Sequence, residues 1–220
     1  LTMGHWRERP DYIFSRFYSN YISWENQLGL SERSRLGVSV SWPFLKLEAN
    51  VYELRNQVYL NHMAMPVQNP DAIRAFTAAA TLNFSFGVFR SRHQWMFQHF
   101  SSTNFERFPG IAGYNSLYAD MHLFEGALGL QAGFDFTWIP SYDFMRFMPV
   151  NGLFYAQNTY SSRDAYLLDA FVNLQIKRTR FFLKMQNLSP LAGTLPNYSI
   201  PFYPLPDTAF KFGVSWMFFD

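Results

Sequence analysis

The sequence contains no cysteine, few charged residues and no long apolar run, and each absence excludes a class of protein. Without cysteine there is no disulfide framework, no cysteine-bound zinc and no thiol chemistry. Charged residues make up 15% of the 220 residues, against about 25% in ordinary soluble domains. The net charge of +2 gives no electrostatic reason to expect nucleic acid as a partner. Because no segment approaches ~18 consecutive apolar residues, the sequence does not encode a membrane-spanning helix.

Aromatic side chains, in contrast, are abundant and form 20% of the sequence. So many rings would drive collapse, which excludes a disordered chain. Residues 128–138 show how the apolar side chains are arranged: one parity carries Leu128, Leu130, Ala132, Phe134, Phe136 and Trp138, and the other carries Gln131, Asp135 and Thr137. Side chains of a β-strand point alternately to its two faces. This segment therefore predicts a strand with one apolar and one polar face.

The same alternation recurs along the chain. It is clear at residues 45–51, 76–86, 117–123, 168–177, 180–186 and 210–218, and weaker at 17–29, 35–42 and 92–100. Together these segments predict about ten strands, most of them near the ~9–11 residues that a tilted strand needs to cross a bilayer.

The predicted connections alternate between tight turns and long loops. Tight turns are expected at residues 43–44, 88–91, 125–126 and 178–179, and long loops at 61–71, 101–114, 139–165 and 188–207, with a modest loop at 30–34. Transmembrane barrels have this asymmetry, and closing the sheet removes the edges that lipid cannot hydrogen-bond. We therefore predict an all-β fold, an antiparallel transmembrane β-barrel, as a single domain over residues 1–220. Its apolar parity would face lipid and its polar parity the lumen.

The charged residues of the polar parity are candidates for lining the lumen. The basic ones are Lys46, Lys177, Arg180, Lys184 and Lys211, and the acidic ones are Glu48, Asp135 and Asp169. This excess of positive charge would mildly favour anions. Alternatively, the charges pair across the lumen and plug it. The sequence leaves both interpretations open.

Catalytic and metal chemistry find little support in the sequence. The five histidines lie outside any metal-binding frame such as HExxH. Ser116, Asp120 and His122 lie on one predicted strand, from which they cannot easily converge on a single reacting atom. We therefore expect no catalytic residue, no metal site, no cofactor and no enzymatic activity.

Four segments resemble a known family. Residues 210–220 read Phe-Lys-Phe-Gly-Val-Ser-Trp-Met-Phe-Phe-Asp, residues 147–158 read Phe-Met-Pro-Val-Asn-Gly-Leu-Phe-Tyr-Ala-Gln-Asn, residues 169–173 read Asp-Ala-Phe-Val-Asn, and Phe-Pro-Gly at 108–110 precedes Tyr118. As a set they are similar to the putative porin family of Bacteroidota outer membranes. The resemblance implies a bacterial outer-membrane barrel of which this chain is the C-terminal part. It also implies that Trp216, Phe218 and Phe219 are the signal read by the barrel-assembly machinery.

These observations lead us to expect a porin-like channel for passive diffusion of small solutes through the barrel lumen. Its partners would be outer-membrane lipids and, during biogenesis, the barrel-assembly machinery. The alternative is a structural or accessory subunit of a larger outer-membrane complex for assembly, secretion or nutrient uptake, with other outer-membrane proteins as partners. The bulky apolar segment 145–155 motivates this alternative, because exposed apolar patches often mark contacts.

Overall fold

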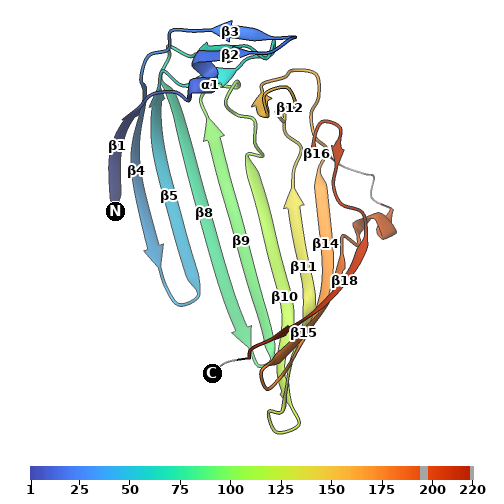
Figure 1. The fold of residues 1–220 in the computed structure, drawn as a ribbon. Helices are drawn as coiled ribbons and strands as arrows, with labels where there is room; N and C mark the ends of the chain where they lie inside the picture. The colour runs from blue at the N-terminus through green and yellow to red at the C-terminus, as the bar shows by residue number, and fades with distance from the viewer. Residues whose placement is uncertain (194–197, 219–220) are drawn as a thin grey trace.

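The computed structural model describes residues 1–193 and 198–218, and its main feature is a strongly curved antiparallel sheet of ten strands (Figure 1). Each strand lies beside the next long strand of the chain. In order across the sheet the strands are β1 (Thr2–Glu8), β4 (Ser31–Ser41), β5 (Leu45–Arg55), β8 (Ile73–Phe86), β9 (Phe89–Phe100), β10 (Ile111–Leu123), β11 (Leu128–Ile139), β14 (Ala165–Ile176), β15 (Thr179–Gln186) and β18 (Ala209–Trp216). The predicted all-β, antiparallel fold is confirmed.

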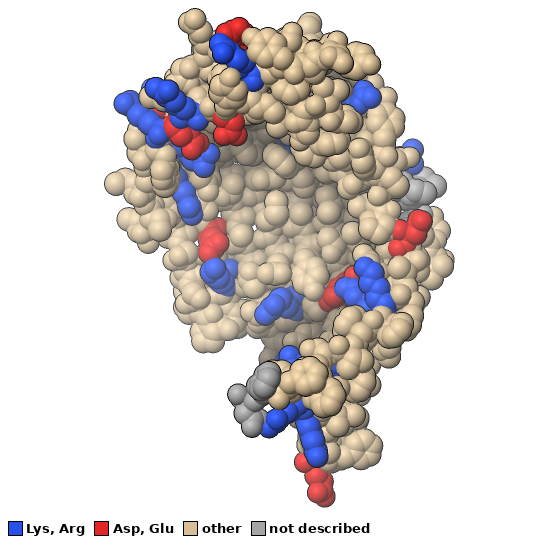
Figure 2. Space-filling view, in the orientation of Figure 1, with Lys and Arg blue, Asp and Glu red and all other residues tan. Residues whose placement is uncertain are grey.

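Strand pairing separates apolar and polar residues onto opposite faces of this sheet. Phe134 of β11 pairs with Ala170 of β14, and the next residue, Asp135, pairs with Asp169. Because paired residues point to the same side of a sheet, these two rows continue across neighbouring strands. We call the face that carries Phe134 the apolar face and the face that carries Asp135 the polar face. The polar face lines the hollow of the curved sheet (Figure 2).

Tight turns lie at one end of the sheet and long loops at the other (Figure 1). The tight connections are residues 42–44, 87–88, 124–127 and 177–178, and the long ones are 9–30, 56–72, 101–110, 140–164 and 187–208. Gly87 and Gly126 have positive φ angles of 57° and 91° in two of the tight turns, a conformation that glycine adopts without a steric penalty. The predicted alternation is therefore confirmed from residue 42 onward, with boundaries displaced by a few residues.

The long loops carry the remaining short elements. These are α1 (Tyr12–Ser15), β2 (Arg16–Tyr18), β3 (Ser23–Glu25), β6 (Val58–Leu60), β7 (Pro66–Gln68), β12 (Arg146–Met148), β13 (Leu153–Tyr155), the 3-10 helix η1 (Ser189–Ala192), β16 (Tyr198–Ile200) and β17 (Tyr203–Pro204). Within the described ranges, no helix has the length and apolar character needed to cross a bilayer.

Most of the fully buried apolar side chains lie at the loop end rather than against the middle of the sheet. Leu60 and Phe144 are 1% and 4% exposed, and the backbone N–H of Ala156 donates a 2.9 Å hydrogen bond to the carbonyl of Leu60. In the loop before β4, Trp24 is buried and its indole N–H donates to the carbonyl of Ile13 at 2.7 Å. The loops therefore have small cores of their own, whereas the sheet leaves its apolar face uncovered.

The N-terminal strands differ from the sequence prediction. Residues 17–29 were predicted as a strand of the sheet, but they contain the short hairpin β2–β3 within a long loop. The first strand of the sheet is β1, and residues 31–34 of the predicted loop belong to β4. β1 escapes detection because neither parity is apolar: Met3 shares its face with His5 and Arg7.

Candidate lumen-lining face

The polar face carries charged side chains of both signs, and Figure 2 shows Lys, Arg, Asp and Glu spaced around its hollow. From the pairing, its basic residues are Arg33, Arg35, Lys46, Arg90, Arg92, Arg180, Lys184 and Lys211, and its acidic residues are Glu8, Glu48, Asp120, Asp135 and Asp169. Eight basic side chains against five acidic ones give this face a positive excess within the described strands.

The structure places seven of the eight predicted lumen-lining residues on strands of the polar face. They are Lys46 and Glu48 on β5, Asp135 on β11, Asp169 on β14, Arg180 and Lys184 on β15, and Lys211 on β18. The prediction was wrong in placing Lys177 on a strand. This residue lies in the tight turn between β14 and β15 with a φ of 52°, because the chain reverses there one residue earlier than the sequence indicated.

The charges of β11, β14, β15 and β18 gather in what we call the central charge cluster, namely Asp135, Asp169, Lys184 and Lys211. Lys184 Nζ lies 2.8 Å from Asp169 Oδ2 and 3.7 Å from Asp135 Oδ2. Asp169 also accepts a 2.7 Å hydrogen bond from the backbone N–H of Asn187. Lys211 lies beside Lys184 through the pairing of β15 with β18. Two carboxylates and two ammonium groups leave this cluster formally neutral.

Other basic side chains of the polar face bind neutral groups. The guanidinium of Arg35 donates to Asn50 Oδ1 at 2.9 and 2.7 Å, and Arg92 Nε donates to Asn83 Oδ1 at 3.0 Å. Lys46, in contrast, has an acidic partner in Glu48 at 2.6 Å. Within the described strands, some charges of the polar face therefore pair with neighbours on the same wall, while a positive excess remains. Anion preference and a plugged lumen both stay predictions.

Two adjoining hollows open on the polar face. One, of about 590 Å³, is lined by Asp120, His122, Gln175 and Arg180 among others, and lies toward the tight turns. The other, of about 380 Å³, is lined by Tyr114, Tyr118, Asp135, Phe171 and Lys184 among others. Gln131, Asn173 and Phe182 line both. The face can thus receive a small solute among charged, amide and aromatic side chains.

Aromatic rings on the polar face were not predicted from the sequence, because the apolar parity was expected to face lipid. The rings of Tyr118 and Phe171 lie 6.2 Å apart between centroids, on either side of Gly133. Phe182 lies against Gly213, where a Cβ would come within 2.4 Å of the ring. The sequence feature that could have revealed these rings is their alternation with the apolar parity. Phe171 lies two residues from Asp169, and Phe182 lies two residues from Arg180, on the same face.

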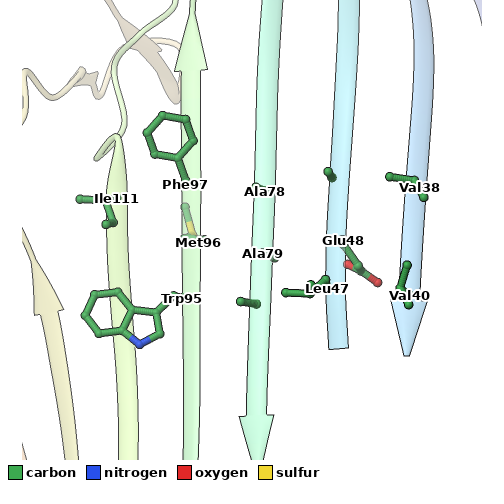
Figure 3. A pocket seen from close by; sticks show the side chains of 12 residues that line it. Val38, Val40, Leu47, Glu48, Ala78, Ala79, Trp95, Met96, Phe97 and Ile111 are labelled. Carbon is green, nitrogen blue, oxygen red and sulfur yellow. The ribbon is translucent and has the colours of Figure 1, made fainter. Parts of the chain in front are cut away.

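The apolar face exposes large side chains across the whole sheet. Leu117 is 58% exposed, Phe134 55% and Phe212 73%. Figure 3 shows a groove of about 440 Å³ on this face, with Trp95, Phe97 and Ile111 on one side of Ala78 and Val38, Val40 and Leu47 on the other. In water such a continuous apolar surface would be unfavourable, whereas hydrocarbon tails can cover it without cost to polar groups.

The C-terminal residues follow directly from the last strand. β18 ends at Trp216, whose ring stacks on that of Phe218 at 5.0 Å between centroids. Phe219, the third residue of the predicted assembly signal, lies outside the described residues. The role of these three residues stays a prediction.

The residues considered for catalysis lie in a row along β10. Ser116 and Asp120 are four residues apart on an extended strand, which separates them by about 13 Å. In the part of the chain that the structure describes, no three histidine or carboxylate side chains are placed to share a metal ion.

An antiparallel sheet with an apolar outside, a charged hollow inside, and tight turns and long loops at opposite ends is the architecture of an outer-membrane β-barrel. The chain belongs to the putative porin family, whose model matches residues 1–220. It is therefore a protein of the bacterial outer membrane. None of the curated proteins matches the chain.

Solved structures with a similar fold are outer-membrane receptors and transporters. The pyoverdine receptor FpvA of Pseudomonas aeruginosa PAO1 has a TM-score of 0.63 at 11% identity, covering 98% of this chain and 33% of the receptor. The FrpB iron transporter of Neisseria meningitidis has a TM-score of 0.57 at 10% identity, covering 86% and 31%. BauA, the ferric preacinetobactin receptor of Acinetobacter baumannii, has a TM-score of 0.50 at 14% identity, covering 86% and 28%. The chain spans about a third of the length of these proteins.

Proposed function

We propose that the chain forms part of the wall of a channel through which small solutes diffuse passively across the outer membrane. The polar face is the observation that carries this proposal, because it is hollowed and keeps basic side chains that have no acidic partner. Among the described residues, no carboxylate lies within 4 Å of Arg180 or Lys211. Selectivity would then depend on pore width and lining charge, and transport would need no catalytic step.

Completion of the barrel is the second part of the proposal. β1 and β18 are the two edges of the described sheet. An edge strand in lipid has backbone N–H and C=O groups that no water can satisfy, so a stable membrane sheet has to close. We propose that further strands of a longer protein pair with β1 and β18. The share of the similar receptors that this chain spans, about a third, supports this arrangement.

The proposal also includes partners. The apolar face would contact outer-membrane lipids, and Trp216, Phe218 and Phe219 would be read by the barrel-assembly machinery. An accessory role in a larger complex has less support, because the apolar segment 145–155 partly covers itself. The ring of Phe147 packs on Phe154 of the same segment at 5.3 Å, and on Tyr203 of another loop at 6.1 Å between centroids.

Charge reversal of Arg180 and Lys211 tests the channel directly. Among residues 1–193 and 198–218 neither side chain forms an ion pair, so replacing both with glutamate changes the lining charge without removing a salt bridge seen there. We expect the intact protein to conduct in planar bilayers, and the Arg180→Glu/Lys211→Glu variant to shift its reversal potential toward cations in a KCl gradient.

Lys177→Glu is the matched control, since it changes one of the same charges within the tight turn rather than along the wall. It should shift the reversal potential less than either single reversal at Arg180 or Lys211. Silent bilayers with correctly folded protein, or unchanged selectivity in the double variant, would contradict the proposed diffusion path.

A further inference from the structure

The polar face combines open aromatic rings with amide side chains in one place. Tyr118, Phe171 and Phe182 supply the rings, and Gln131 and Asn173 supply the amides. Amide and aromatic side chains are unusual neighbours for a wall that only repels or attracts ions. Their combination is typical of a binding site in which apolar contact gives affinity and a few polar groups fix orientation.

Strand register brings these five residues together. Gln131 of β11 pairs with Asn173 of β14, and Asn173 pairs with Phe182 of β15, so the three side chains lie in one row across the sheet. Phe171 follows on the same face two residues from Asn173, and its ring lies 6.2 Å from that of Tyr118. All five side chains line the hollow of about 380 Å³.

A glycine keeps the ring of Phe182 accessible from the hollow. Phe182 lies over Gly213, whose missing side chain lets the ring settle against the strand, and the residue is 45% exposed. Gly133 lets β10 approach β11 closely at Tyr118, because a Cβ there would lie 2.4 Å from Tyr118 Cβ. The ring of Phe182 therefore rests on backbone on one side and can receive a ligand on the other.

The electrostatics of the hollow favour a neutral ligand. The central charge cluster, which borders the rings, contains two carboxylates and two ammonium groups. Such a compensated set produces a weak net field but many hydrogen-bond donors and acceptors. Within the described residues, the side chains of Gln131 and Asn173 form no hydrogen bond, so each amide has both donor and acceptor capacity for a ligand.

We propose that Tyr118, Phe171, Phe182, Gln131 and Asn173 form a binding subsite for neutral sugars in their ring form. A pyranose ring has an apolar face of C–H groups that stacks on an aromatic ring, and its rim of hydroxyls both donates and accepts hydrogen bonds. The five side chains offer both types of contact. This inference rests on the proposed function, because it names the class of solute that the channel wall would hold during passage.

Saturation-transfer NMR titration of the intact protein with maltotriose tests the subsite. The protein is kept in lauryldimethylamine oxide, a detergent without a sugar headgroup, and mannitol serves as a hexitol that has the hydroxyls but no ring face. We expect saturable binding of maltotriose and none of mannitol. Phe182→Ala should raise the Kd for maltotriose by about fivefold to tenfold, because an aromatic contact is lost.

Phe181→Ala is the matched control, since this neighbouring ring lies on the apolar face and its removal should leave the Kd unchanged. Phe182→Leu keeps an apolar side chain without a flat ring, and should weaken binding like Phe182→Ala even if the alanine variant folds poorly. Heat-modifiable mobility in gels reports folding of every variant.

Several outcomes would overturn the subsite: no maltotriose binding, equal binding of mannitol, or equal losses in the Phe181 and Phe182 variants. Binding of inorganic phosphate in place of maltotriose would reassign the hollow to anions. Conductance of the same samples separates the two proposals. Sugar binding with silent bilayers would contradict only diffusion, whereas open channels without sugar binding would contradict only the subsite.

Discussion

Gly133 shows how one residue fixes the shape of the polar face. A Cβ at this position would lie 2.2 Å from the carbonyl oxygen of Leu117 and 2.6 Å from the Cα of Tyr118, both of which are backbone atoms. These atoms cannot move without disturbing the pairing of β10 with β11. The close approach also lets the ring of Tyr118 reach that of Phe171. Glycine is therefore required here for packing rather than for an unusual φ angle.

Gly133→Ala should destabilise the folded protein, because the added methyl group overpacks a contact between backbones. We expect a loss of about 1–3 kcal/mol in the free energy of unfolding, measured by urea titration in lipid vesicles. Gly129→Ala is the control on the same strand and face, since the nearest atom to its Cβ would be Gln175 Cβ at an ordinary 3.5 Å. Equal stability of the two variants would mean that the close approach at Gly133 has no energetic weight.

At the residue scale, the sequence predicts which face of the sheet a side chain lies on, but not which side chain it pairs with. Alternation assigned Asp135, Asp169 and Lys184 to the polar face, yet their ion pairs depend on register, which alternation does not give. Arg92 was missed as a lining residue because its parity also contains Met96, so neither face of that segment is purely polar. The rings of the polar face were missed because apolar residues were expected to face lipid.

At the element scale, strand detection depended on how purely each face is covered. β11 and β14 have a continuous apolar parity and were predicted within a few residues of their bounds. β1 mixes Thr2, Gly4 and Trp6 on one face with Met3, His5 and Arg7 on the other, so its sequence has no apolar parity. Residues 17–29 have the rings of a strand, but Trp24 packs on Phe17 within a loop hairpin. Only the pairing of strands in the folded protein distinguishes a strand of the large sheet from a hairpin within a loop.

The loop hairpin β2–β3 is stabilised by contacts to one titratable side chain, the carboxylate of Glu25. Tyr18 donates a 2.9 Å hydrogen bond to Glu25, and Arg16 pairs with the same carboxylate. The hydrogen bond from Tyr18, followed by the contact with Arg16, lowers the pKa of Glu25 below its ordinary value. These contacts to ionised Glu25 therefore stabilise the hairpin fully at pH values above the ordinary pKa of glutamate. Their contribution disappears as the pH falls through the lowered pKa of Glu25.

NMR titration of the Glu25 carboxyl carbon should give a midpoint below that of an unperturbed glutamate. Tyr18→Phe should move the midpoint upward, because the first of the two stabilising contacts is removed. Tyr12→Phe changes a nearby exposed tyrosine that does not hydrogen-bond Glu25, so its midpoint should match that of the unmodified protein. A midpoint that Tyr18→Phe leaves unchanged would show that this hydrogen bond does not form.

At the scale of the whole molecule, the two faces of the ten-stranded sheet differ in chemical character. The apolar face is uncovered from β4 to β18, and the fully buried side chains are concentrated among the loops and at the loop end of the sheet. A soluble sandwich would instead pack its apolar face against a second layer. The alternation of the sequence predicts one apolar and one polar face for both a soluble sandwich and a transmembrane barrel. The asymmetry between tight turns and long loops favoured the transmembrane barrel. The bore of the channel could not be predicted, since it depends on the total number of strands in the closed barrel.

The central claim is that the apolar face contacts lipid hydrocarbon while the polar face contacts water. Because the chain has no cysteine, single cysteines can be introduced along β15 (Thr179–Gln186) and labelled with a nitroxide in lipid vesicles. Labels at 181, 183 and 185 should collide with oxygen, which concentrates in hydrocarbon, and labels at 180, 182 and 184 with a water-soluble nickel complex. Accessibility that does not alternate along this strand, or that alternates in the opposite phase, would contradict the account.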